Sequence, residues 1–380
     1  MNNTLEKPFE YLTRSGKDAR PFESEVVKNW YRARAFVLDR LGNVAFKPDD
    51  NAHLHVVIDG DTPLMLSLVR QVALTAHYIN FDEDNENEAE RRRTVITIVS
   101  TKTSEEILAE LEDEACLGNL LSLCKYTIDE TVNKDSYIDI EIEVVKSRPA
   151  IDTDNQNEFL FEENDVMTFC NSKTEDELCG IDTRKAQYAD RMYKLGELID
   201  NLPAENIHDA KRYTLALNAF LFDKLQDSLD ALINASEWEK DQIIVRKALS
   251  NIFCADCFES KAKSIELCRE DSEQKESELW AHYNELLCKS EHARWVVEKL
   301  IMGFRPLNDA ERFEDEKLAP YPVKRNKYRD ALKKDVNRLA HIDICSYTDL
   351  RRIDPNNMKY DSFLMLGIPH ILRKVREGAL

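Results

Sequence analysis

The sequence predicts an α/β domain of Rossmann-like type followed by a mainly α-helical C-terminal half. Two short β-branched runs flank a segment with helical spacing, which indicates a βαβ unit near the start of the chain. After residue 183 the apolar residues repeat at helical spacing. A chain of 380 residues also exceeds what one hydrophobic core usually organises.

We expect four regions along this chain. They are an N-terminal helical extension (1–48), the Rossmann-like α/β domain (49–183), a helical connecting region (184–276) and a small, mostly α-helical C-terminal domain (277–380).

The first expected element is an aromatic and basic helix over 29–38 that packs onto the following domain. A β-branched run over 53–60 ends in a glycine and predicts a strand with a tight turn. Thr62 is a suitable N-cap and Pro63 a suitable first residue for a helix over 64–78.

Further apolar runs predict strands over 94–100, 138–145 and 166–169, with a helix over 105–115. The second of these runs alternates Ile and Glu, which is typical of a half-exposed edge strand. Strands that alternate with helices predict a mostly parallel, doubly wound sheet over 50–183.

The C-terminal half is expected to begin with helices over 188–199, 220–232, 242–263 and 277–302. The last part, 307–380, has short helical patterns and prolines that indicate turns, the last of them Pro369.

Charge is distributed unevenly over a formal net charge of −20. Residues 289–380 hold 19 Lys and Arg against 14 Asp and Glu, while 152–182 hold ten acids and one base. We expect this acidic stretch to be a solvated surface insertion or a partly disordered loop. The negative total argues against binding of duplex DNA or an anionic membrane, because both need cationic side chains. The negative net charge is still compatible with a small anion bound in a basic pocket of the C-terminal region.

The composition also indicates where the protein works. The sequence has no apolar run long enough for a membrane span, and residues 1–20 lack the apolar core of a signal peptide, so a cytoplasmic protein is expected. Nine cysteines without framework spacing fit reduced thiols. Cys254 and Cys257 lack a second pair of ligands, so no metal site is expected.

The turn after the first strand lies where a dinucleotide fold holds its phosphates. Gly60, Asp61 and Thr62 are therefore the candidate cofactor-binding residues. The G-x-G-x-x-G fingerprint is absent, and Asp59 and Asp61 place negative charge where a pyrophosphate would bind. We favour a fold that is retained without its cofactor.

The densest group of functional residue types lies within 290–306. Glu291, Arg294 and Trp295 are three and four residues apart, which places them on one helical face. Trp can stack on a nucleobase, Arg can pair with a phosphate and Glu can accept from an exocyclic amine. A buried Trp beside a helix-surface ion pair is the alternative, and spacing alone leaves both open.

The same segment resembles the signature helix of the RyR domain, the repeat first named in ryanodine receptors and present in many bacterial proteins. The matching residues are Glu291, His292, Arg294, Trp295, Gly303, Phe304 and Arg305. The segments 341–350 and 359–372 are similar to later parts of that domain, whereas 312–338 is longer and more charged than its usual connection.

Bacterial RyR proteins often carry a TrkA-type Rossmann domain, which the segment 54–78 resembles, and 246–263 is similar to the helix that connects the two. The resemblance implies a sensor of nucleotides or nucleotide-derived signals, often in antiphage and conflict signalling.

We therefore expect a non-enzymatic ligand sensor whose C-terminal pocket binds a nucleotide or nucleotide-derived molecule, and which acts through a homo-oligomer or a partner effector protein. The candidate ligand-binding residues are Glu291, His292, Arg294, Trp295, Arg305, Tyr347, Lys359 and Asp361. Replacing Arg294 by Ala is expected to weaken binding and to leave the unfolding temperature nearly unchanged.

Two other functions stay open. One is a metal-dependent nucleotide-processing enzyme that uses His292 with Glu291, or Asp59 and Asp61 with a divalent ion. The other is an acidic interaction scaffold with no small-molecule ligand.

Overall fold

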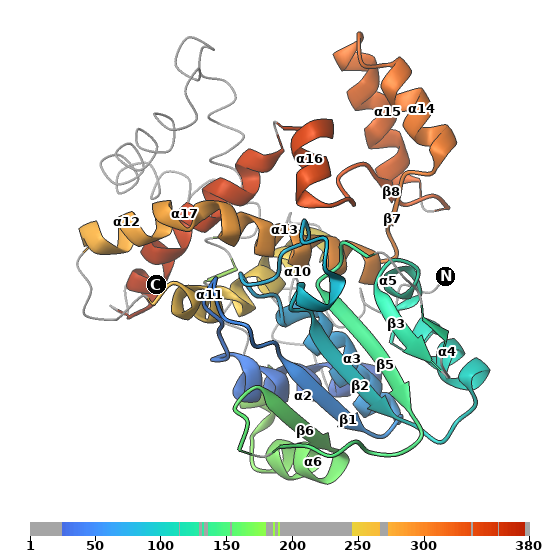
Figure 1. Ribbon diagram of the computed structural model, residues 1–380, viewed down its shortest axis with the longest axis vertical. Helices are drawn as coiled ribbons and strands as arrows, with labels where there is room; N and C mark the ends of the chain where they lie inside the picture. The colour runs from blue at the N-terminus through green and yellow to red at the C-terminus, as the bar shows by residue number, and fades with distance from the viewer. Residues whose placement is uncertain are drawn as a thin grey trace.

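The computed structural model has an N-terminal parallel α/β sheet domain followed by a mostly helical C-terminal region (Figure 1). The structure describes residues 25–113, 115–128, 131–132, 136–152, 154–179, 185–186, 189–190, 245–266, 273–335, 337–355 and 357–376. The helices expected over 188–199 and 220–232 lie outside these residues, apart from Ala189 and Asp190.

Six strands form one sheet in the order β4-β3-β5-β2-β1-β6. They are β1 (His55–Asp59), β2 (Thr94–Val99), β3 (Lys125–Ile128), β4 (Thr131–Val132), β5 (Ile140–Val145) and β6 (Glu158–Glu162). All neighbouring strands are parallel except β3 and β4. The prediction of a mostly parallel sheet is therefore confirmed.

The predicted strand, glycine turn and capped helix are confirmed at β1 and α3 (Pro63–Thr75). Gly60 has a φ of +135°, a conformation that residues with a Cβ rarely adopt. Thr62 accepts a hydrogen bond from the backbone N–H of Met65, and Pro63 occupies the first turn. The helix expected before β3 is α4 (Ser104–Asp113), and a short helix, α5 (Gly118–Leu121), follows it.

The prediction that β5 is an edge strand is wrong, because β5 lies between β2 and β3. Its two glutamates are accommodated by polar neighbours on adjacent strands. Lys125 Nζ lies 2.8 Å from a carboxylate oxygen of Glu141, and Thr97 Oγ1 donates to Glu143 at 3.1 Å. Cross-strand partners explain the alternation without solvent exposure of an edge.

The acidic stretch is part of the folded domain, so the prediction of a surface insertion or loop is wrong. It contains β6, α6 (Glu163–Asn171) and α7 (Glu175–Cys179), and the predicted strand at 166–169 is helical. Phe161 of β6 is buried and packs edge-on against Phe36 of α2 (Glu25–Leu41), with ring centroids 5.0 Å apart. The N-terminal helix thus packs on the α/β domain as predicted.

The two faces of the sheet differ in polarity. On one face, residues such as Val56 and Ile96 point to the apolar core. On the other face, polar side chains of neighbouring strands form a series of hydrogen bonds, the polar chain. In that chain His55 Nε2 lies 2.9 Å from Thr97 Oγ1, which donates to Glu143. A doubly wound sheet usually has two apolar faces, so this polar chain departs from the predicted arrangement.

The helical region follows and includes a small parallel strand pair. Its elements are α10 (Val245–Asp256), α11 (Phe258–Ser264), α12 (Glu273–His282), α13 (Asn284–Ile301), β7 (Arg305–Pro306), α14 (Asp309–Lys317), α15 (Pro322–Lys334), β8 (Ala340–His341), α16 (Tyr347–Ile353) and α17 (Met358–Arg376). The two long helices predicted over 242–263 and 277–302 are each interrupted, at Cys257 and Tyr283. Pro369 lies inside α17 instead of marking a turn.

One hydrophobic core extends from α2 through the sheet to α17. Helix α13 contacts α3 and α5 of the sheet domain and also α10 and α17 of the helical region (Figure 1). None of the helices in the described part of the chain has the length and hydropathy that a membrane-spanning segment needs. The predicted boundaries between regions, after residues 183 and 276, stay a prediction.

Candidate ligand-binding pocket

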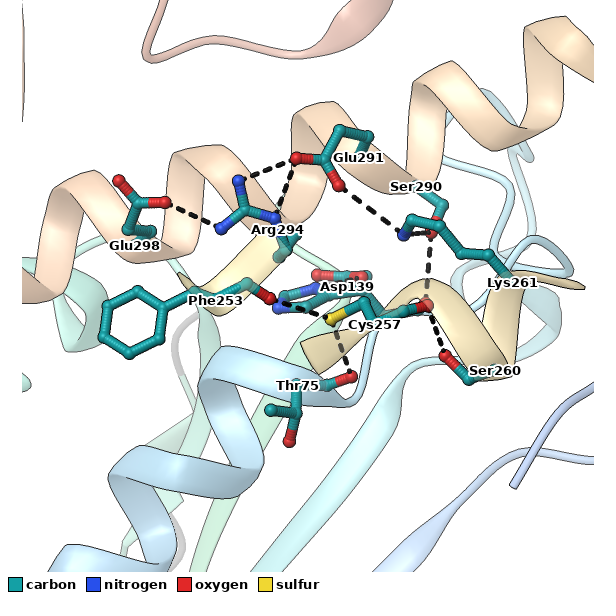
Figure 2. A network of polar contacts seen from close by, with 11 residues as sticks. Thr75, Asp139, Phe253, Cys257, Ser260, Lys261, Ser290, Glu291, Arg294 and Glu298 are labelled. Atoms are coloured by element: carbon teal, nitrogen blue, oxygen red, sulfur yellow. Dashed lines mark hydrogen bonds and ion pairs between the residues drawn. The ribbon is translucent and has the colours of Figure 1, made fainter. Parts of the chain in front are cut away.

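One face of α13 carries a buried charge network. Arg294 donates to Glu291 at 2.9 and 2.7 Å and to Glu298 at 2.7 Å, and all three side chains are fully buried. Figure 2 shows these residues beside Lys261 of α11, whose Nζ donates to Ser290 Oγ at 3.0 Å. Lys261 Nζ also lies 3.7 Å from Glu291 Oε2, so every charged group of this network is next to an opposite charge.

Opposite charges favour the ionised forms of Arg294 and Glu298. Burial alone would lower the pKa of Arg294, but Glu291 and Glu298 raise it well above its usual value. Burial likewise opposes ionisation of Glu298, while Lys299 and Arg294 lower its pKa. The guanidinium of Arg294 thus binds two carboxylates of its own helix, and this network packs inside the protein.

The adjacent face of α13 opens on a cavity of about 480 Å³. Its lining comes from α13, α15, β8, α16 and α17: His292, Trp295, Asp330, Lys333, His341, Asp343, Leu350, Asn357, Tyr360 and Asp361. Cavities of roughly 300–1,000 Å³ with aromatic walls and a few convergent polar groups are typical of small-molecule sites. This cavity is the candidate functional site.

Hydrogen bonds with the backbone fix the tautomers of both histidines in the pocket. His292 Nε2 lies 3.0 Å from the carbonyl oxygen of Cys345, so this nitrogen carries the proton and Nδ1 is an acceptor. His341 Nδ1 accepts from the backbone N–H of Asp343 at 3.2 Å, so its proton is on Nε2.

Burial keeps both rings neutral at pH 7. It lowers the pKa of His292 to about 4 and that of His341 well below its ordinary value. The pocket therefore offers one imidazole acceptor and one imidazole N–H donor.

Carboxyl groups supply most of the remaining polar surface. Asp343 Oδ2 accepts from Asn357 Nδ2 at 2.7 Å, whereas Asp343 Oδ1 is buried without a hydrogen-bond partner. Burial raises the pKa of Asp343, and it raises that of Asp361 well above its usual value. Lys333 is the cation among the lining residues.

The pocket unites three of the eight predicted ligand-binding residues, His292, Trp295 and Asp361. Glu291 and Arg294 belong to the buried network instead.

The other three predicted residues have protein partners. Arg305 makes a two-pronged contact with Glu311 at 2.7 and 2.9 Å. The ring of Tyr347 is buried edge-on to His292, with centroids 5.7 Å apart, and Lys359 Nζ lies 5.0 Å from the centroid of the Tyr360 ring. None of these three side chains lines the pocket.

Sequence reasoning missed His341 and Asp343 as site residues. No periodic pattern marks them, because β8 ends at His341 and Asp343 lies in the turn that follows. Ile342 lines a separate, smaller cavity of about 220 Å³.

The polar side chains of the predicted cofactor loop at the end of β1 bind other side chains of the protein. Asp61 contacts Ser100 Oγ and Lys102 Nζ, the latter at 3.2 Å, and Thr62 Oγ1 donates to Glu163 at 3.1 Å. In the part of the chain that the structure describes, no group of three or more His, Cys, Asp or Glu side chains is arranged to hold a metal ion.

Comparison with known proteins finds no relative. No family model, no curated protein and no solved structure matches the sequence. The similarity to RyR domains rests on the motif residues alone, and the structure supports a Rossmann-like α/β sheet without identifying a family.

Proposed function

We propose that the protein is a ligand sensor that binds a nucleotide or a nucleotide-derived molecule in the pocket between α13, α15 and α17. The observation that carries this proposal is the pocket itself, which combines aromatic rings, two neutral imidazoles and a carboxylate oxygen without a partner. A planar heterocycle with hydrogen-bonding edges complements such a lining.

The resemblance to RyR domains adds support, because two of its signature residues, His292 and Trp295, line this pocket. We extend the proposal to the finer assignment, a bacterial RyR-type sensor with a TrkA-type domain that acts in antiphage or conflict signalling. In that assignment the Rossmann-like domain serves as a platform, since the polar groups of its β1 loop already have protein partners.

In this proposal, α16 links the pocket to the output. Leu350 of α16 lines the pocket, and the first backbone N–H groups of the same helix bind a loop of the α/β domain. Glu83 accepts from the N–H of Tyr347 at 3.1 Å and from that of Thr348 at 2.8 Å. A ligand that favours one position of α16 thereby acts on the contact between the two regions.

The test is a thermal-shift screen of the full chain against NAD, ADP-ribose, ATP and cyclic di- and trinucleotides, followed by calorimetry. Bound ligand raises the apparent stability by mass action. Lys333→Ala removes the pocket cation and is expected to weaken binding about tenfold. Lys334→Ala is the matched control, since this neighbouring lysine is exposed and outside the lining.

Equal affinities of the two variants would move the site away from this pocket. If no nucleotide stabilises the parent protein, the sensor proposal fails and the acidic scaffold becomes the better explanation.

A further inference from the structure

The polar lining of the pocket contains both hydrogen-bond acceptors and donors. The acceptors include Asp343 Oδ1, which has no hydrogen-bond partner, and His292 Nδ1, an unprotonated ring nitrogen. The donors include the ammonium group of Lys333, the Nε2–H of His341 and the indole N–H of Trp295. A ligand that engages Asp343 must bring N–H donors.

Asp343 is held in place for such a donor. Its backbone N–H donates to His341, its Oδ2 accepts from Asn357, and only 7% of the residue is exposed. A buried carboxylate oxygen without a donor costs free energy, and a ligand N–H that reaches Asp343 Oδ1 would recover this cost.

A carboxylate accepts two parallel N–H bonds from one planar partner. Among nucleobases, guanine presents such a pair, the ring N1–H beside the exocyclic amino group. Adenine and cytosine place an acceptor nitrogen next to their amino group, and uracil flanks its single N–H with two carbonyl oxygens. Asp343 Oδ2 has a second lone pair and can share the contact with its Asn357 bond.

We infer that the pocket selects a guanine-type edge, with Asp343 accepting from two adjacent N–H groups of the ligand. This inference rests on the proposed function, and it specifies the ligand as a guanine nucleotide or a molecule built from one. Lys333 on α15 supplies the cation for a phosphate of the same ligand.

The first experiment compares GMP, IMP and AMP by calorimetry with the unmodified full chain. IMP differs from GMP by the loss of the exocyclic amino group. We expect GMP to bind about tenfold or more tightly than IMP, because a hydrogen bond to a charged acceptor is lost. AMP is expected to bind more weakly than GMP. Equal affinities of GMP and IMP, or a preference for AMP, would overturn the inference while leaving a nucleotide site in place.

The second experiment uses Asp343→Asn, which replaces a pure acceptor by an amide with one acceptor and one donor. XMP carries a carbonyl where GMP carries its amino group. The variant is expected to change its preference from GMP toward XMP by about tenfold relative to the parent. Asp309→Asn, at the exposed start of α14, serves as the charge-matched control and should keep the parent's preference.

These outcomes separate the inference from the proposed function. If no nucleotide binds, both fail. If nucleotides bind but Asp343→Asn keeps the parent's ratio of GMP to XMP affinity, only the guanine assignment fails. If the variant does not fold, the GMP to IMP ratio of the parent decides.

Discussion

Two faces of α13 bear charged and polar residues, but one face is buried in the core and the other lines a cavity. On one face Arg294, Glu291 and Glu298 pair with one another and exclude solvent. On the other, His292 and Trp295 line a cavity that also contains Asp343, whose Oδ1 has no hydrogen-bond partner. The difference shows that neighbouring residues of one helix can stabilise the core on one face and line a cavity on the other.

Helical phase separates the two faces. Glu291 and Trp295 are four residues apart and were expected on one face, but the boundary between core and cavity runs between them. An offset of about 40° over four residues suffices to place one side chain in the core and the other at the cavity.

The largest expected loss of stability follows from disrupting the charge network on the buried face of α13. Arg294→Met leaves Glu291 and Glu298 buried without their guanidinium, so the free energy of unfolding should fall by about 3–5 kcal/mol in urea denaturation. This reverses the expectation from sequence that the unfolding temperature would hardly change.

The control removes the charges together. Arg294→Met combined with Glu291→Gln and Glu298→Gln should be more stable than the single variant, because no unpaired carboxylate remains. A single variant as stable as the parent would show that the network contributes nothing to the fold.

An effect of intermediate size is expected at the cavity face, where the burial of His292 makes the free energy of unfolding depend on pH. The pKa of His292 is lowered from about 6.5 to about 4, so between these pH values the unfolded chain binds a proton that the folded chain does not. The lowered pKa of His292 therefore has no effect on the free energy of unfolding above pH 6.5. Below that pH it makes the free energy of unfolding fall, by about 3 kcal/mol at pH 4.

His292→Gln keeps a donor for Cys345 and should lose this part of the pH dependence. The raised pKa values of Asp343 and Asp361 act in the opposite direction in both proteins, so the difference between parent and variant isolates the histidine. Parallel stability curves for the two proteins between pH 4 and 7 would contradict a neutral, buried His292.

The smallest expected effect lies outside both faces. Arg351 and Glu285 pair at 2.6 Å with more than half of each side chain exposed. Arg351→Ala should lower the free energy of unfolding by less than about 1 kcal/mol and leave ligand binding unchanged. A loss as large as that of Arg294→Met would mean that burial is not what distinguishes the two networks.

Local patterns predicted the elements that depend on local causes. β1, α3 and β2 follow from β-branched runs, a glycine turn and a capped helix. β6 was hidden because its core residue, Phe161, stands among acidic neighbours, and its partner Phe36 lies on a helix far away in the sequence. The short run 166–169 has no period long enough to distinguish strand from helix.

The site was predicted in part for the same reason. His292, Trp295 and Asp361 could be chosen by residue type, and all three line the cavity. The role of Arg294 depends on Glu298, one further turn along the helix, and that of Asp343 on an unfilled hydrogen bond. Neither feature can be read before the packing is known.

The contact of Glu83 with α16 has a consequence for the order of folding. The first N–H groups of a helix have no partners within it, and here a carboxylate 264 residues earlier supplies them for Tyr347. Because this partner is so distant in the sequence, α16 gains these N-terminal hydrogen bonds only when the tertiary fold brings Glu83 beside it. During synthesis the α/β domain emerges first, so the chain can prepare this binding site for α16 before the helix itself is made.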